Sequence, residues 1–416
     1  MSFWHRTGAL RWWIIGIVML GTMLNYLTRS TLAVAAPSFM VDLHIDEQQY
    51  SYITAAFQGG IMLQPVVGYI LDVIGLRSGL ALFAAGWGLL SMAHGLAFSW
   101  QWLFALRGLL GFAEGTSHTG GLKVVSEWFP ARERGFAGGI YNLGASAGAA
   151  LAAPLVAGSI ALWNWRAAFV VTGVLALLWA LLWLANYRTP QTHPSISEEE
   201  RDLILSGQEA HIQERGERPS PLRLLAQRNF WGIALPRFLA DPTWGTLTFW
   251  MPLYLVKVRG FNLGEIAVSA FLPFIAADLG CMFGPALALF LQRRGISLIN
   301  ARRWTFTFGA LLMTGMVFVA SVESAWLAVA LLCLGGFAHQ TLSVTVITMA
   351  SDLFPRNELG TVAGLAGTFA NSSILIFSLL IGGLVASLGY GPFFIALGLL
   401  DLVAALLLWT LVKAPR

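Results

Sequence analysis

Twelve apolar stretches of helical length dominate the sequence, and charged or turn-forming residues bound each of them. They cover residues 12–37, 50–72, 78–98, 101–126, 135–160, 165–187, 229–256, 264–291, 298–320, 324–351, 358–386 and 391–412. About 20 consecutive apolar residues cross a bilayer as an α-helix. The chain is 57% hydrophobic and 11% charged, whereas soluble domains carry about 25% charged residues. The pattern predicts an all-α membrane protein with twelve transmembrane helices and excludes a water-soluble enzyme.

The distribution of basic residues predicts the orientation of these spans. Nineteen of the 25 Lys and Arg residues fall on one side, three on the other and three within spans. Because cytoplasmic loops are enriched in Lys and Arg, both termini are predicted to be cytoplasmic. The first apolar stretch is longer than the core of a signal peptide, so we expect it to remain as the first helix.

A polar segment and an internal repeat divide the chain into halves. Residues 188–228 form the one long polar stretch, which we expect to be a solvated linker with some amphipathic helix after Ser197 as its N-cap. Gly111–Glu114 recurs as Gly336–His339, and Ser126–Pro130 recurs as Ser351–Pro355, both at an offset of 225 residues. This offset preserves helix direction, so two parallel-repeat six-helix bundles are predicted. The expected domains are residues 1–187, a cytoplasmic loop at 188–228, and residues 229–416.

Glycines at three- and four-residue spacing occur in the fifth span, between Gly135 and Gly148, and in the eleventh, between Gly360 and Gly367. Small residues at this spacing let helices approach closely. Both helices are therefore expected to present close-packed faces. The sequence contains no P-loop, so ATP drive is not expected.

The turn after the second span, Gly68–Arg77, resembles the cytoplasmic motif of the major facilitator superfamily. Its glycines, Asp72 and Arg77 are in place, whereas Val73 stands where a basic residue often follows the aspartate. The resemblance implies that Asp72 and Arg77 form a gating or structural charge site, with a weaker local charge network than in many relatives.

The whole chain is similar to the anion:cation symporter branch of this superfamily and, within it, to bacterial hexuronate transporters. The resembling stretches are Asn25–Arg29, Glu127–Arg134, Phe230–Ala240 and Gly335–Gln340. The resemblance implies a monomer in the bacterial inner membrane that takes up a hexuronate, such as glucuronate or galacturonate, together with a proton. No metal or other cofactor and no nucleic-acid partner is expected.

Ionisable residues inside spans are costly and mark functional sites. Arg29 lies deep in the first span, and its match to the Tyr-x-x-Arg pattern of relatives, with Tyr26, favours a guanidinium that binds the substrate carboxylate. The alternative is an arginine that snorkels to the membrane interface. In many relatives an acidic residue precedes this arginine. Here Thr28 stands in that place, so one coupling carboxylate is absent.

The fourth span carries Arg107 and Glu114 seven residues apart, on one helical face and about 10.5 Å apart. One interpretation is a fixed ion pair between Arg107 and Glu114. We favour a relay in which Glu114 takes up a proton and alters the field that Arg107 presents to the anion. The repeat aligns Glu114 with His339, a second titratable group, and places Gln340 beside it. Both His339 and Gln340 are expected to line the substrate site.

In the seventh span, the four-residue spacing of Arg237 and Asp241 predicts an i,i+4 ion pair. A structural or gating role is favoured, with direct substrate contact as the alternative. Asn371, among small residues of the eleventh span, is expected to bind substrate hydroxyls. The sequence predicts no partner for Asp278 or Asp401.

These residues together predict a secondary transporter of an anion, and the resemblance implies that the anion is a sugar acid. Within transport, the alternatives are a carrier or exporter of another organic anion, such as an aldonate or aromatic acid, or a drug:proton antiporter. A membrane receptor would bind without flux, and the lack of an appended signalling domain disfavours it. Cys281 and Cys333 lie in apolar runs and predict no disulfide framework.

Overall fold

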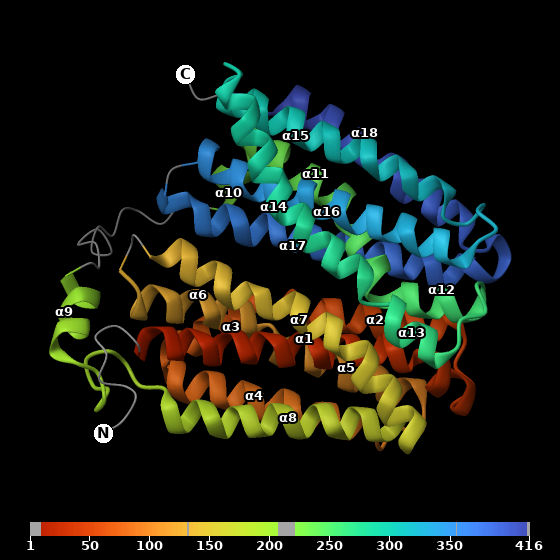
Figure 1. Ribbon diagram of the computed structural model, residues 1–416, viewed down its shortest axis with the longest axis horizontal. Coiled ribbons are helices and arrows are strands. Elements are labelled where there is room, and N and C mark those ends of the chain that lie inside the picture. The colour runs from red at the N-terminus through yellow and green to blue at the C-terminus, as the bar shows by residue number, and fades with distance from the viewer. Residues whose placement is uncertain (1–9, 131–132, 207–220, 355, 414–416) are drawn as a thin grey trace. The chain divides into compact units, whose positions relative to one another are not determined.

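The computed structural model describes residues 10–130, 133–206, 221–354 and 356–413, and its regular elements there are all helical (Figure 1). Before the central loop they are α1 (Leu10–Asp42), α2 (Glu47–Ile61), α3 (Gln64–Ile74), α4 (Leu76–His94), α5 (Trp100–Glu114), α6 (Thr116–Trp128), α7 (Arg134–Leu162) and α8 (Trp165–Asn186). From the loop onward they are α9 (Glu198–Ser206), α10 (Pro221–Leu225), α11 (Arg228–Gly245), the π-helical turn η3 (Thr246–Trp250), α12 (Met251–Lys257), α13 (Leu263–Ser269), α14 (Leu272–Arg293), α15 (Leu298–Met313), the 3₁₀ turn η4 (Thr314–Phe318), α16 (Ala325–Leu353), α17 (Arg356–Leu388) and α18 (Gly391–Leu411). Each predicted span corresponds to one helix or to a short run of helices, which confirms the all-helical fold.

Within the described residues, eight helices are long and apolar enough to cross a membrane, and the bent pair α2 and α3 makes a ninth span. Three further predicted spans fall short of this test. Two of them carry charges that the sequence analysis assigned to the site, namely Arg107 and Glu114 in α5 and Arg237 and Asp241 in α11. The third, α15, carries two arginines in its first two turns. Helix α5 has 15 residues and α15 has 16, so these two spans fall short because each helix is interrupted.

In the second and seventh predicted spans, the α-helix is interrupted close to a proline. The second bends by 41° between α2 and α3, where Pro65 lies in the first turn of α3. Proline has no N–H group, so the hydrogen bonding of α2 cannot continue through it. In the seventh span, the π-helical turn η3 follows Pro242, whose carbonyl accepts a hydrogen bond from Oγ1 of Thr246 at 2.9 Å. Such π-helical turns are frequent at functional sites.

The chain forms two compact units. The first comprises Met1–Ala35 and Gly60–Arg215, and the second comprises Ala36–Gly59 and Gly216–Arg416. Helix α1 thus runs from the first unit into the second, with Pro37 just beyond the boundary. Within the second unit, Tyr50 donates to the carbonyl of Phe249 at 2.6 Å. The predicted boundaries at 187 and 229 rest on the polar loop and remain a prediction.

Glycines bring helices of the first unit into backbone contact. A Cβ atom added to Gly148 of α7 would lie 2.1 Å from the carbonyl oxygen of Met23 in α1. In the same unit, where α4 runs beside α8 (Figure 1), a Cβ atom on Gly173 would lie 2.5 Å from the carbonyl oxygen of Gly88. In the fifth span, the expected close packing is formed at Gly144 and Gly148, whereas a Cβ atom on Gly138 or Gly139 would meet no atom of the described residues within 4 Å.

The eleventh span differs from this expectation. Within the described part of the chain, a Cβ atom added to Gly364 or Gly367 of α17 would meet no atom within 4 Å. No helix of the second unit therefore packs closely on these two glycines in the described residues, and close packing there remains a prediction. The spacing of small residues shows that a helix can be approached closely, but not that another helix does so.

Equivalent glycines of the repeat lie at close helix crossings in both units. In the first unit, a Cβ atom on Gly60 would lie 3.0 Å from the carbonyl carbon of Gly111 in α5. In the second, a Cβ atom on Gly336, the repeat mate of Gly111, would lie 2.3 Å from the carbonyl oxygen of Pro273. The glycine of the repeated Gly-Phe-Ala motif thus lies at a close contact between helices in each unit.

The first part of the central loop is anchored on the first unit. Helix α9 begins as predicted, since the N–H of Glu200 donates to Oγ of Ser197 at 3.2 Å. The buried carboxylate of Glu200 accepts from the backbone N and from Nη1 of Arg11, both at 3.1 Å. Nε of Arg11 in turn donates to Glu133 at 3.0 Å. Glu200 and Ile204 are buried, whereas Glu198, Glu199 and Asp202 are exposed, so α9 is an amphipathic helix with one face on the first unit.

Hydrogen bonds also hold the residues between α8 and α9 in place. Tyr187 donates to Oε2 of Glu127 at 2.6 Å. The backbone N–H of Ser195 donates to Nδ1 of His193 at 3.2 Å, and Nε2 of His193 lies 3.0 Å from the carbonyl oxygen of Asn186. This arrangement needs the neutral imidazole, because a protonated Nδ1 cannot accept.

Candidate functional site

In the first unit, Arg29 is held by three neighbours. Its Nε lies 3.4 Å from Oε2 of Glu114 in α5, and its Nη2 donates to Oδ1 of Asn25 at 3.3 Å. The guanidinium lies over the ring of Tyr26, 4.5 Å from the centroid, an arrangement that stabilises a cation. The side chain of Arg29 is only 17% exposed and that of Glu114 is fully buried. Arg29 therefore points to a neighbouring helix of its own unit, which does not fit the snorkelling alternative.

Arg107, on α5, contacts the turn of α1 that carries Arg29. It is fully buried, and its Nη2 donates to the carbonyl oxygen of Arg29 at 3.0 Å. Two permanently charged guanidinium groups and one carboxylate thus lie within the core of the first unit. The ion pair of Glu114 is made with Arg29, on a different helix, whereas the sequence analysis had weighed a pair with Arg107 on its own helix.

Two polar residues of this cluster were missed by the sequence analysis. Oγ1 of Thr28 lies 2.7 Å from Oε1 of Glu114, and Nδ2 of Asn25 donates to the backbone carbonyl of Glu114 at 3.4 Å. The available signal was their position, because Asn25, Thr28 and Arg29 are three and four residues apart on one face of an otherwise apolar helix.

A second charged cluster lies in the second unit. Nη2 of Arg237 is 3.4 Å from Oδ2 of Asp241, so the structure forms the i,i+4 ion pair. Oδ1 of Asp241 lies 3.9 Å from Nε2 of His339 in α16. The ring of His339 stacks on Trp244, with centroids 5.6 Å apart. Among the described residues, no group of three His, Cys, Asp or Glu side chains could hold a metal ion.

The structure does not join every predicted residue to these clusters. Gln340 follows His339 on α16 and is half-buried, and Asn371 of α17 donates to the carbonyl of Gly367 at 2.9 Å within its own helix. Neither forms a hydrogen bond with the His339 cluster in the described ranges. Arg77 is exposed and donates to the carbonyl of Leu184 at 2.9 Å. The side chain of Asp72 lies outside the described residues, so the charge site predicted there remains a prediction.

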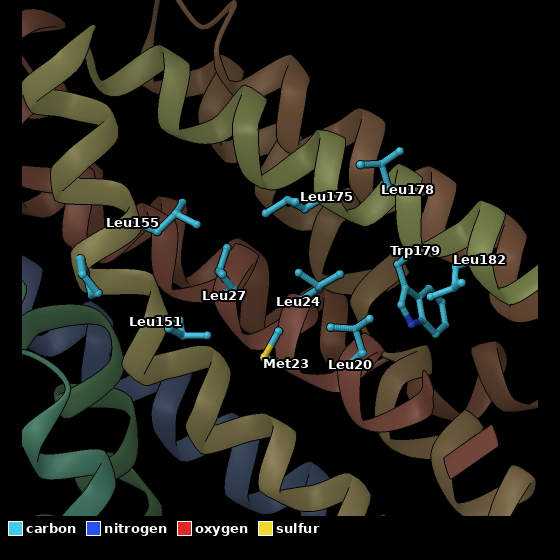
Figure 2. A pocket seen from close by; sticks show the side chains of 11 residues that line it. Leu20, Met23, Leu24, Leu27, Leu151, Leu155, Leu175, Leu178, Trp179 and Leu182 are labelled. Carbon is cyan, nitrogen blue, oxygen red and sulfur yellow. The ribbon is translucent and has the colours of Figure 1, made fainter. Parts of the chain in front are cut away.

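A cavity of about 780 Å³ lies in the first unit, and none of these polar groups lines it. Figure 2 shows its lining side chains on α1, α7 and α8, which are Leu20, Met23, Leu24, Leu27, Leu151, Leu155, Leu175, Leu178, Trp179 and Leu182. Pro154 completes the lining. A sugar acid needs polar groups to replace its hydration, so this hydrocarbon surface is not suited to binding one. The charged cluster around Arg29 is the better candidate.

Several known proteins are similar to this chain over most of its length. The hexuronate transporter of Escherichia coli strain K12 is 46% identical over 412 residues, which cover 98% of this chain and 95% of the relative. The galacturonate transporter of Dickeya chrysanthemi is 48% identical over 325 residues, 77% of this chain and 94% of the relative. A D-galactonate transporter of Escherichia coli O6:H1 is 26% identical, covering 96% of this chain and 95% of that protein.

Solved structures and a family model agree with the fold. The crystal structure of a bacterial homologue of the human lysosomal transporter Spinster, in an inward-facing and occupied conformation, superimposes with a TM-score of 0.73 at 15% identity. The match covers 97% of this chain and 96% of that one, and at this identity it shows the fold alone. The model of the Major Facilitator Superfamily matches residues 18–301 and 296–416. The chain therefore belongs to the Major Facilitator Superfamily and is a multi-pass membrane transporter, not an enzyme.

Proposed function

We propose that this protein takes up a hexuronate, such as glucuronate or galacturonate, together with at least one proton across the bacterial inner membrane. It would act as a monomer with both termini in the cytoplasm. The single observation that carries the proposal is the buried cluster of Arg29, Arg107 and Glu114, in which two fixed cations face one titratable carboxylate. Names of relatives that are 46–48% identical point to the same class of substrate.

Arg29 would bind the substrate carboxylate. A guanidinium offers a planar fork of donors that matches a carboxylate in a bidentate geometry. Tyr26 and Asn25 hold this fork in place without neutralising it. Arg107, one helix away, would add a second positive charge that makes the site attractive to an anion. Gln340, His339 and Asn371 are proposed to bind the sugar hydroxyls.

Competition for Arg29 would couple the anion to a proton. Glu114 is fully buried and its counter-ion is Arg29. A substrate carboxylate that takes over Arg29 deprives Glu114 of that partner, and an isolated buried carboxylate favours its neutral form. Protonation of Glu114 and binding of the anion therefore favour each other, and this linkage is reciprocal. His339, beside Asp241, is proposed as a second proton site.

An exporter or antiporter of another organic anion is the alternative, since the same cations would serve it. The D-galactonate transporter among the relatives, at 26% identity, carries an aldonate by its name. Direction of flux and choice of substrate separate these functions.

The test is uptake of labelled glucuronate and galacturonate into proteoliposomes with an alkaline interior. We expect accumulation above equilibrium that collapses when a protonophore removes the gradient. Glu114→Gln should abolish accumulation while exchange of labelled for unlabelled substrate continues. No accumulation by the wild type, or accumulation unchanged in Glu114→Gln, would refute the proposal. Binding without any exchange would indicate a receptor.

A further inference from the structure

The hydroxyl group of Thr28 has more acceptors than hydrogens. Its Oγ1 lies 2.7 Å from Oε1 of Glu114 and 2.8 Å from the backbone carbonyl oxygen of Asn25. A hydroxyl donates one hydrogen and accepts through its lone pairs. Thr28 is 1% exposed, so bulk water does not replace either contact. The hydroxyl therefore cannot donate to both oxygens at once.

The two arrangements of this hydrogen match the two protonation states of Glu114. An ionised Glu114 can only accept, so Thr28 donates to it. A protonated Glu114 donates its O–H to Oγ1 of Thr28, which then turns its own hydrogen to the carbonyl of Asn25. The heavy atoms occupy the same positions in both cases. Oε1 of Glu114 keeps a hydrogen bond throughout, which avoids the cost of an unsatisfied buried polar atom.

Resting on the proton-coupled uptake proposed above, we propose that Thr28 is a positioning residue for the coupling proton. Its hydroxyl rotates between Glu114 and the Asn25 carbonyl as Glu114 loses and gains its proton. One O–H bond forms or breaks at Glu114, and that proton comes from or returns to water. Thr28 keeps its own hydrogen, and no group is oxidised or reduced.

Other charged and titratable groups also act near Glu114. They are Arg29 and Tyr26 on α1 and Arg107 on α5, with His94 at the end of α4 near Arg107. The side chains of His118 on α6 and Asp72 on α3 lie outside the described residues. A substitution of Thr28 that keeps its shape leaves all these groups in place, so its effect can be assigned to the hydroxyl.

Thr28→Val keeps the shape and removes the hydroxyl, and Thr28→Ser keeps the hydroxyl. A bond donated to an ionised carboxylate is stronger than one between neutral groups. Thr28→Val therefore removes more stabilisation from the ionised form of Glu114 than from the protonated form. We expect the alkaline limb of the uptake–pH profile to move upward by about one pH unit, tenfold in proton concentration. Thr28→Ser should restore the wild-type profile.

The measurement is initial uptake of labelled glucuronate or galacturonate between about pH 5 and 9, with equal pH on both sides of the membrane. An unshifted profile in Thr28→Val, or an equal shift in Thr28→Ser, would overturn the assignment. If Thr28→Val is inactive, the pH dependence of substrate binding to the purified protein gives the same readout. A wild type that carries no hexuronate would instead refute the proposed function.

Discussion

Replacing Glu114 with glutamine should tighten substrate binding and remove its pH dependence. Glutamine keeps the size of the side chain, but it carries no charge and therefore does not compete with the substrate carboxylate for Arg29. In the wild type above neutral pH, the anion must displace the Glu114–Arg29 pair, whose atoms are 3.4 Å apart and whose carboxylate is fully buried. In Glu114→Gln, the substrate carboxylate binds Arg29 without first displacing another carboxylate.

The size of the effect follows from the cost of an unpaired charge in the membrane. Insertion scales give about 2.5–3.5 kcal/mol for a charge at the centre of a transmembrane helix. At about 1.4 kcal/mol for each factor of ten, this cost corresponds to a dissociation constant about 60- to 300-fold lower in Glu114→Gln than in the wild type at pH 8. At low pH, where wild-type Glu114 is protonated, the two proteins should bind alike.

Calorimetric titration of the purified protein with glucuronate or galacturonate at pH 6 and pH 8 measures this difference. Glu200→Gln is the matched control, because Glu200 is also a buried carboxylate paired with an arginine of the same unit, but its partner is Arg11. The control should keep the wild-type pH dependence. If Glu114→Gln binds no tighter than the wild type at pH 8, or retains its pH dependence, the competition for Arg29 is not the coupling step.

Three further predictions concern stability. Gly148→Ala should lower the melting temperature, because the new methyl group would lie 2.1 Å from the carbonyl oxygen of Met23. The control Gly158→Ala, whose methyl group would have no described atom within 4 Å, should not lower it. Equal melting temperatures of the two variants would contradict the close contact at Gly148. Asp401→Leu should leave the melting temperature unchanged or raise it, since this fully buried carboxyl makes no hydrogen bond within the described residues, and a fall of several degrees would argue for a partner. Burial lowers the pKa of His193, so the folded loop holds a neutral imidazole at a pH where the unfolded chain is already protonated. Docking of the loop should therefore be fully stable above about pH 6.5 and weaken as the pH falls. The measurement is hydrogen exchange of residues 188–206, which should become faster at lower pH after correction for intrinsic rates. An unchanged corrected rate would refute this prediction.

Hydropathy predicted the spans because each apolar stretch is long enough to cross the bilayer by itself. The breaks within spans depend on single residues. The bend before α3 follows from Pro65, and the signal was present in the sequence. By contrast, the sequence of α17 does not reveal that the space around Gly364 is open among the described residues. Close approach is a property of two helices, and the pattern of one helix reports only half of it.

The charged residues of the site were predictable, because a charge inside a membrane span is costly and is kept where it has a function. Their partners were not predictable. Spacing along a helix identifies neighbours three or four residues away, such as Arg237 and Asp241. The partner of Glu114 is Arg29, 85 residues away, and that pairing depends on which helices pack together. The same limit applies to Glu200, which composition assigned to a solvated linker and the fold pairs with Arg11.

Helix α1 carries the proposed carboxylate ligand and is also one of the covalent connections between the two units. Pro37 lies one residue past the point where the helix leaves the first unit. Since proline cannot donate to the carbonyl four residues earlier, α1 lacks a backbone bond to Ala33 at this point. Arg29 is eight residues away, about 12 Å along the axis. The turn that lacks this bond thus lies about two helical turns from Arg29, so bending there would change the direction of the segment that carries the guanidinium.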